Sequence, residues 1–453
     1  MKILGRGCVI AVMFACLFEI SLVAQQATTD QVNASAQSSS GQSSSDESSA
    51  KPVFIGANDP IQAMNGSGEQ QEQYVPALDG SGLISMSGGK ANHLMVGAVF
   101  SGGWDSNPEN LPTASSSGVY TLSPLIGVHA STPNTQFILQ YMPTITRYSS
   151  SAYSGQTMNI ASVAISGKPS ERWAWDIKGM GSYGQDSIRF LAPTQTVAVG
   201  GVPGTGPNAA SYLPNAGTVT YIYGSGGLTY RKSERDSIEM TAANTFSHYT
   251  TLSGNNSIAT TSLRYNRDLS PNLGIRVYGQ TYYYYGALNC TSFGGGFGVT
   301  WHAADRFHLS LNAGPQLNTS SCGQQQGFSY SGAFSTRLTH NSQLYLLAAR
   351  EPTVSYLGPG LWLESASGGY QRQVGLKGDL SFDVGYVKSD TLTATSSYND
   401  VFVDGSYGHQ LPHGLNLSAS FRRYSGSTNG ADFSRNVLLF SLGWAPTVGH
   451  IFQ

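Results

Sequence analysis

From His93 onward, apolar side chains recur at every second residue within short segments, as at 94–100, 173–183 and 380–386. This is the spacing of a β-strand with one apolar and one polar face, because successive side chains of a strand point to opposite sides. The chain from His93 onward is therefore predicted to be all β.

Eighteen such segments can be counted between residues 93 and 445. They repeat at about twenty residues, which suits tilted bilayer-spanning strands of about 9 to 11 residues plus their loops. We expect a closed antiparallel transmembrane β-barrel of about 18 strands, with 16 as the alternative count. The predicted strands start near residues 93, 118, 135, 156, 172, 218, 235, 257, 273, 292, 307, 327, 343, 361, 379, 397, 415 and 432.

The connections between these segments alternate in length. Short turns occur, for example, at 132–134, 168–171 and 232–234, and longer loops rich in Ser, Asn and Gly lie between them, as at 105–117, 190–217 and 425–431. Tight turns on one side and long loops on the other are typical of a bacterial outer-membrane barrel with both termini in the periplasm. The loop at 190–217 carries no charged residue after Arg189, and we expect it either to fold inward and narrow the lumen or to form an outer lip.

Composition supports a membrane barrel. Charged residues make up 11% of the chain, against about 25% in a typical soluble protein. A barrel needs less charge, because its outer band faces lipid and hydroxyl and amide groups can wet its interior. The net charge of −2 gives no basic surface for phosphates, so nucleic acid is excluded as an expected partner.

The N-terminal segment has the pattern of a secretory signal peptide over residues 1–24. Lys2 and Arg6 precede an apolar stretch at 8–18, and Ser-Leu-Val-Ala at 21–24 is the predicted cleavage site. An uncleaved anchor would need about 20 apolar residues, which Glu19 interrupts. We expect a disordered Ser- and Gln-rich leader at 25–51, a periplasmic linker at 52–92 and the barrel at 93–453.

Two cysteines remain after removal of the signal peptide. The predicted strand order places Cys290 in the fifth outer loop and Cys322 in the sixth. An even pair in an exported protein predicts a disulfide that joins adjacent outer loops, and two unrelated cysteines are the alternative.

Three stretches near the start of the barrel resemble a known family. They are Gly-Trp-Asp-Ser-Asn at 103–107, Tyr-Thr-Leu-Ser-Pro at 120–124 and Phe-Ile-Leu-Gln-Tyr-Met-Pro at 137–143, with Tyr148 beyond. The chain is similar here to the β-barrel porin 2 type of outer-membrane protein. That resemblance implies an outer-membrane barrel, often associated with exopolysaccharide loci.

The sequence shows no catalytic or metal-binding constellation. Histidines such as His302 and His308 lack the spacing of HExxH or Cys/His ligand sets. The glycines at 294–298 lie within a predicted strand, with no following helix, so they indicate close packing in a barrel wall. We expect no enzyme activity, no metal and no cofactor.

Charges on the less apolar face of each strand are predicted to point into the lumen. Two interpretations stay open: a water-filled channel whose charges set ion selectivity, or pairs that bridge a narrow, closed interior. The predicted lumen residues are Asp176, Lys178, Glu239, Arg264, Arg276, Arg337, Glu364, Asp383, Asp400, Asp404 and Arg422.

Aromatic residues are expected mainly in girdles at the two membrane interfaces. Members of the predicted girdles are the tyrosines at 282–285, Trp173, Trp175, Tyr221, Tyr223, Trp301 and Trp444. The alternative is a sugar-stacking track inside the lumen, for which Tyr278 and Tyr282 are the first candidates. Pro124, Pro143 and Pro315 fall inside predicted strands and are expected to mark bulges or strand ends.

The leading functional hypothesis is a passive or exopolysaccharide-associated outer-membrane channel. The alternative is a structural or adhesive surface barrel whose outer loops bind a ligand and whose lumen is closed. Expected partners are outer-membrane lipid and lipopolysaccharide, the barrel-assembly machinery, and polysaccharide or small solutes.

Overall fold

The computed structural model describes most of the chain between residues 93 and 444, and two short strands before it. The gaps within this part are 110–114, 133, 186–217, 251–254, 287–288, 304–306, 323–325, 340, 356–357, 376, 392–396 and 429–430. The predicted signal peptide, the leader and the loop at 190–217 lie outside the described residues. Within the predicted linker, β1 (Val53–Phe54) and β2 (Ile84–Ser85) pair antiparallel.

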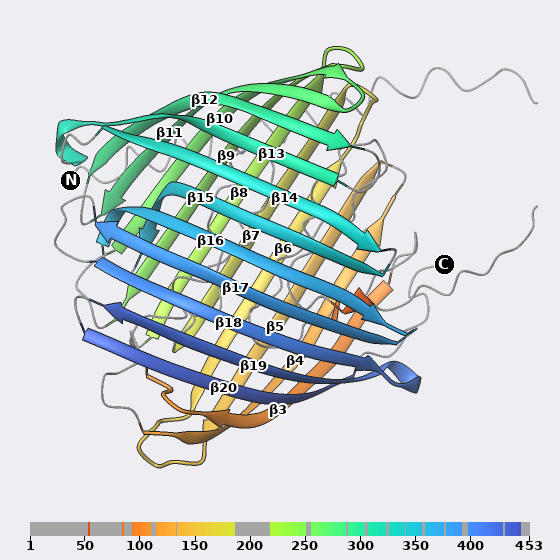
Figure 1. The fold of residues 1–453 in the computed structure, drawn as a ribbon, viewed down its shortest axis with the longest axis vertical. Helices are drawn as coiled ribbons and strands as arrows, with labels where there is room; N and C mark the ends of the chain where they lie inside the picture. Colours follow the sequence, from red (N-terminus) through yellow and green to blue (C-terminus); the bar gives the residue numbers. More distant parts are fainter. Residues whose placement is uncertain are drawn as a thin grey trace, which may run out of the picture. The chain divides into compact units, whose positions relative to one another are not determined.

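Eighteen antiparallel strands form a closed barrel in which each strand pairs with its sequence neighbours and the last pairs with the first (Figure 1). Each strand begins within three residues of its predicted start, so the count of 18 is confirmed and the alternative of 16 is wrong. The strands are β3 (His93–Asp105), β4 (Ser117–Ser131), β5 (Thr135–Tyr148), β6 (Gln156–Gly167), β7 (Trp173–Gln185), β8 (Thr218–Arg231), β9 (Asp236–Tyr249), β10 (Asn255–Ser270), β11 (Leu273–Gly286), β12 (Cys290–Ala303), β13 (Phe307–Asn318), β14 (Gln326–Thr339), β15 (Ser342–Ser355), β16 (Gly358–Val374), β17 (Gly378–Thr391), β18 (Ser397–Gln410), β19 (Leu415–Thr428) and β20 (Ala431–Trp444).

The helical content of the described residues is small. Two 3-10 turns, η4 (Ser320–Cys322) and η5 (Pro412–Gly414), lie between strands. No helix in this part of the chain has the length and apolar character needed to cross a bilayer.

The two faces of the wall differ in polarity, as the alternation predicts. Phe100 on β3 and Leu263 on β10 are exposed on the outside, whereas their neighbours Ser101 and Ser262 are buried on the inside. Large exposed apolar side chains occur on many further strands, for example Phe297 on β12 and Leu346 on β15. An apolar exterior and a hydroxyl- and amide-rich interior are the arrangement of a barrel that spans a membrane.

Part of the predicted aromatic girdle lies where expected. Trp173, Trp301 and Trp444 are exposed on the outside of the barrel, close to strand ends on the side of the short turns. Trp173 packs on Tyr230 with ring centroids 4.6 Å apart, and Trp301 packs on Phe307 at 4.9 Å. Such clusters suit the headgroup level of a bilayer.

Four other tyrosines of the predicted girdle face inward. Tyr282 and Tyr284 are fully buried on the inner face of β11, and Tyr221 is buried beside Tyr223 on the inner face of β8. The girdle prediction is therefore wrong for these residues, because a tyrosine can occupy either face of a barrel wall and its type does not reveal which. Tyr278 and Tyr282 lie on the inner face, where the alternative places them, but both are buried.

Two of the prolines share one interruption of the backbone ladder. The β4–β5 pairing runs to Leu122 opposite Ile145 and resumes at Ile126 opposite Tyr141, so Pro124 and Pro143 face each other in the gap. Proline has no backbone N–H and cannot donate a hydrogen bond to the neighbouring strand. Because the two prolines are opposite each other, the missing hydrogen bonds of both fall in one gap. The expectation of a bulge or strand end is wrong here, because the gap lies within both strands.

Pro315 on β13 has a similar setting next to the glycine-rich stretch of β12. The β12–β13 pairing is interrupted between Gly294 opposite Gln316 and Phe297 opposite Ala313. A Cβ on Gly296 would overlap the carbonyl oxygen of Ala313. The glycines therefore serve close packing in the wall, as predicted.

The seam between the first and last strands depends on side chains as well as on backbone pairing. Backbone partners extend from Trp444 opposite Ala98 to Val437 opposite Asp105. Beyond that point, the Asn107 side-chain amide donates to the Ser434 carbonyl at 3.1 Å. The segment at 103–107 thus forms the part of the seam on the side of the longer connections, which we call the outer end of the barrel.

An ion pair lies at the centre of this outer part. Arg435 on β20 donates to both carboxylate oxygens of Asp105, and its Nη2 lies 2.6 Å from Oδ2. Asp105 is 2% exposed and also accepts a hydrogen bond from the Asn107 backbone N–H at 3.0 Å. The opposite charges and the hydrogen bonds together compensate the cost of burial.

Replacement of Asp105 by Ala should weaken closure, because it leaves the Arg435 guanidinium buried without its carboxylate. The expected loss of unfolding free energy is about 3–5 kcal/mol. Urea titration of the protein in lipid vesicles, followed by tryptophan fluorescence and heat-modifiable migration, measures it. Asp432→Ala, at an exposed position of the same strand, is the control. Equal midpoints for both variants would contradict this role of Asp105.

Candidate functional site: the barrel interior

Ten of the eleven predicted lumen residues lie on strand positions that face the interior. The assignment follows from alternation with exposed apolar residues on the same strand, such as Leu263 beside Arg264 and Val384 beside Asp383. The ten are Asp176, Lys178, Glu239, Arg264, Arg276, Arg337, Asp383, Asp400, Asp404 and Arg422.

Glu364 is the exception. Its neighbour Ser365 is buried on the inner face of β16, so Glu364 lies on the opposite face. There it pairs with Arg350 of β15, whose Nε lies 3.1 Å from Glu364 Oε1. Near the outer end of β16, Leu363 packs inside against buried Val387. The more apolar face of this segment is therefore the inner one. The prediction places the less apolar face of every strand inside, so it is wrong for Glu364.

Several inward charges form ion pairs along the wall. Arg264 on β10 lies 3.8 Å from Glu239 on the adjacent β9. Arg422 on β19 pairs with Asp404 on the adjacent β18. These pairs link neighbouring strands, so they compensate charge without joining opposite walls of the lumen.

Other inward charges are held by neutral groups. Arg276 donates to the side-chain oxygens of Asn266 at 2.5 Å and Asn312 at 3.3 Å. Asp383 accepts a hydrogen bond from the Tyr345 hydroxyl. These hydrogen bonds orient the two side chains on the inner wall.

The two signs concentrate on different parts of the wall. Inward arginines predominate on β10, β11 and β14, whereas β17 and β18 carry inward aspartates. In the closed order of strands, β18 lies eight strands from β10 in one direction and ten in the other. β14 and β17 are only three strands apart in the same order, so a more basic arc of the inner wall lies next to a more acidic one.

The interior also contains apolar clusters that the alternation did not predict. Met142, Met158, Ile160 and Tyr221 form one on β5, β6 and β8. Another joins β17, β19 and β20 through Val387, Tyr424 and Phe433. In the sequence, the methionines and tyrosines of these clusters stand between small polar residues. Their residue types do not show whether they face the lipid or the interior.

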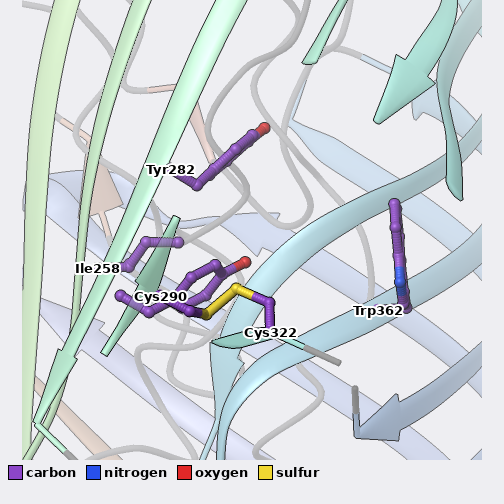
Figure 2. Close-up of a cluster of buried hydrophobic side chains, with 6 residues drawn as sticks. Ile258, Tyr282, Cys290, Cys322 and Trp362 are labelled. Atoms are coloured by element: carbon purple, nitrogen blue, oxygen red, sulfur yellow. A yellow bond between two sulfur atoms is a disulfide. The ribbon is translucent and has the colours of Figure 1, made fainter. Parts of the chain in front are cut away.

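The structure joins Cys290 and Cys322 in a disulfide with Cα atoms 5.4 Å apart. Cys322 ends η4 in the connection between β13 and β14, which is the predicted sixth outer loop, whereas Cys290 is the first residue of β12 rather than part of the connection before it. Both are buried against Tyr284 and Ile258, and Trp362 faces them from the other side of the cluster (Figure 2).

One histidine pair lies inside the barrel near the short-turn side. His302 on β12 and His308 on β13 place their Nδ1 atoms 2.7 Å apart. Within the described residues, no group of three or more His, Cys, Asp or Glu side chains could hold a metal ion. A hydrogen bond joins the two imidazole rings.

Together, the apolar exterior, the closed antiparallel wall and the polar, charged interior define a transmembrane β-barrel of the outer-membrane type. No protein-family model matches the chain, and no curated protein matches it.

Among solved structures, the chain is similar to outer membrane protein OpdK from Pseudomonas aeruginosa, at 10% identity and a TM-score of 0.43, over 78% of this chain and 99% of that one. Pseudomonas aeruginosa OpdO gives 13% identity and a TM-score of 0.43, over 78% and 97%. The siderophore receptor PirA from Acinetobacter baumannii gives 7% and 0.41, over 79% and 81%. The strand count and topology described above come from this chain's own structure.

The disulfide should stabilise the outer ends of β12 and β13. Replacing both cysteines by serine releases a link across 32 residues, and the expected loss of unfolding free energy is about 2–4 kcal/mol. Urea titration of the double variant measures the loss. A cross-linked peptide containing Cys290 and Cys322 in a non-reducing digest verifies the bond, and detection of two thiols instead would contradict it.

Proposed function

We propose that the protein is an outer-membrane channel for the passive diffusion of small polar and charged solutes. The inner face carries the supporting observation: the ion pairs Arg264–Glu239 and Arg422–Asp404 join neighbouring strands instead of opposite walls. A closed interior would favour pairs between opposite walls, because buried charges need close partners. Barrels of about 16–18 strands can leave an aqueous channel.

The proposed orientation has the short turns and both termini in the periplasm. The first barrel strand begins and the last ends on the side of the short turns, at His93 and Trp444. Outer-membrane barrels place short turns in the periplasm and longer loops outside. Lipid and lipopolysaccharide would then contact the exposed apolar band, and the barrel-assembly machinery would insert it.

An inner wall with a basic and an acidic arc suits small solutes that carry charge or a strong dipole. A role in exopolysaccharide export rests on the resemblance of residues 103–143, and it remains part of the proposal. The inward tyrosines of β11 do not add to it, because Tyr282 and Tyr284 are buried and offer no open ring face for a sugar.

A structural or adhesive barrel is the second candidate, and one observation favours it. β10 contacts β15 and β16, and β11 contacts β16, although β10 and β15 are five strands apart around the barrel. The buried cluster that contains Ile258, Tyr284 and Trp362 places these contacts near the outer end. Such a contact narrows the outer mouth. Conductance of the mature protein in planar bilayers distinguishes the candidates, and absence of conductance would sink the channel.

Neutralising charges on the two arcs of the inner wall should shift ion selectivity in opposite directions. Arg276→Gln should increase cation preference, and Asp383→Asn should decrease it, because each removes a fixed charge from the inner wall. Reversal potentials across a KCl gradient measure the shifts. Arg423→Gln, at an exposed outward position of β19, is the matched control. Shifts no larger than that of the control would contradict the proposed path past these residues.

A further inference from the structure

We infer that Trp362 holds the outer end of the β15–β16 hairpin against β10 and β11, and so sets the outer aperture of the lumen. This inference rests on the proposed channel function and identifies a residue that determines which solutes enter. It explains why two pairs of strands that are distant around the barrel approach each other.

The contact is well buried. Trp362 is 6% exposed and packs in one cluster with Ile258 of β10, Tyr282 and Tyr284 of β11, and the Cys290–Cys322 disulfide. Figure 2 shows its ring opposite the disulfide and Ile258. A buried tryptophan contributes a large apolar contact area, so this contact can hold the hairpin in place.

Trp362 lies on the face of β16 that points outward elsewhere. Trp362 and Gly368 are six residues apart, so alternation places them on the same face of β16. The partner of Gly368 on β15 is Leu346, which is exposed on the outside. The pairing of β15 with β16 shows no register shift between these positions. The outer end of the hairpin therefore turns, so that a face exposed to lipid lower in the wall is buried inside.

The wall provides a fitting space for this ring. A Cβ on Gly327 of β14 would overlap the Trp362 indole, so glycine is needed where the ring lies against the wall. The Arg350 guanidinium lies 5.0 Å from the ring centroid and also contacts Glu364. Packing, a cation–π contact and an ion pair thus act on the same short segment.

The cluster divides the outer mouth into two unequal parts. Strands β12 to β14 lie between the two contacting pairs, and the longer arc of the wall includes β17 to β20 and β3 to β9. Solutes would enter along the longer arc, where Asp400 faces inward. Removing the indole should widen this entrance.

Trp362→Ala should raise single-channel conductance roughly twofold and admit larger polyethylene glycols, because the narrowest part of a pore limits both. Trp301→Ala, which truncates an exposed outward tryptophan, is the matched control. Heat-modifiable migration shows that each variant has folded. A folded Trp362→Ala variant with wild-type conductance and polymer exclusion would overturn the inference while the channel function stands.

A second measurement is independent of conduction. Comparing iodide quenching of the wild type with that of Trp362→Phe isolates the emission of Trp362, which should be protected. Strong quenching of this component would overturn the inference even if the channel conducts. A silent wild type contradicts the channel function, and conductance gained by Trp362→Ala would then show that the contact closes the mouth. If both are silent, the channel function fails, and protected emission still supports the contact.

Discussion

Closure of the backbone hydrogen-bond network is the constraint on which the rest of this structure depends. In lipid, an unpaired backbone group costs several kcal/mol, so β20 must meet β3 and no edge can remain. The seam achieves this with eight backbone partner pairs and, beyond them, with the Asp105–Arg435 ion pair and the Asn107 amide. The same constraint explains why Pro124 and Pro143 share one gap instead of interrupting two separate ladders.

Much of the architecture could be predicted because one physical rule governs every strand. Alternation between lipid and interior gave the number of strands and their approximate starts, and turn chemistry gave their order. The rule failed where the interior is itself apolar. Leu363 and Trp362 have similar hydrophobicity but lie on opposite faces of β16, so no sequence pattern could reveal that Glu364 is the residue beside Arg350.

The interior combines two ways of tolerating charge inside a barrel. Pairs such as Arg264 with Glu239 compensate charge locally, whereas Arg276 and Asp383 are oriented by amide and hydroxyl groups. The sequence identified the charged residues but not their partners, because those partners lie on strands whose register is visible only in three dimensions.

The Asp105–Arg435 contact also constrains the order in which the protein can assemble. Its two residues are 330 positions apart in the sequence, and closing a chain segment of that length costs about 5 kcal/mol of entropy if nothing lies between. Each hairpin formed between neighbouring strands shortens the effective loop. We therefore expect the seam to form last, after the other strands have aligned. Until these residues meet, an incomplete wall is an open sheet with two unpaired edges.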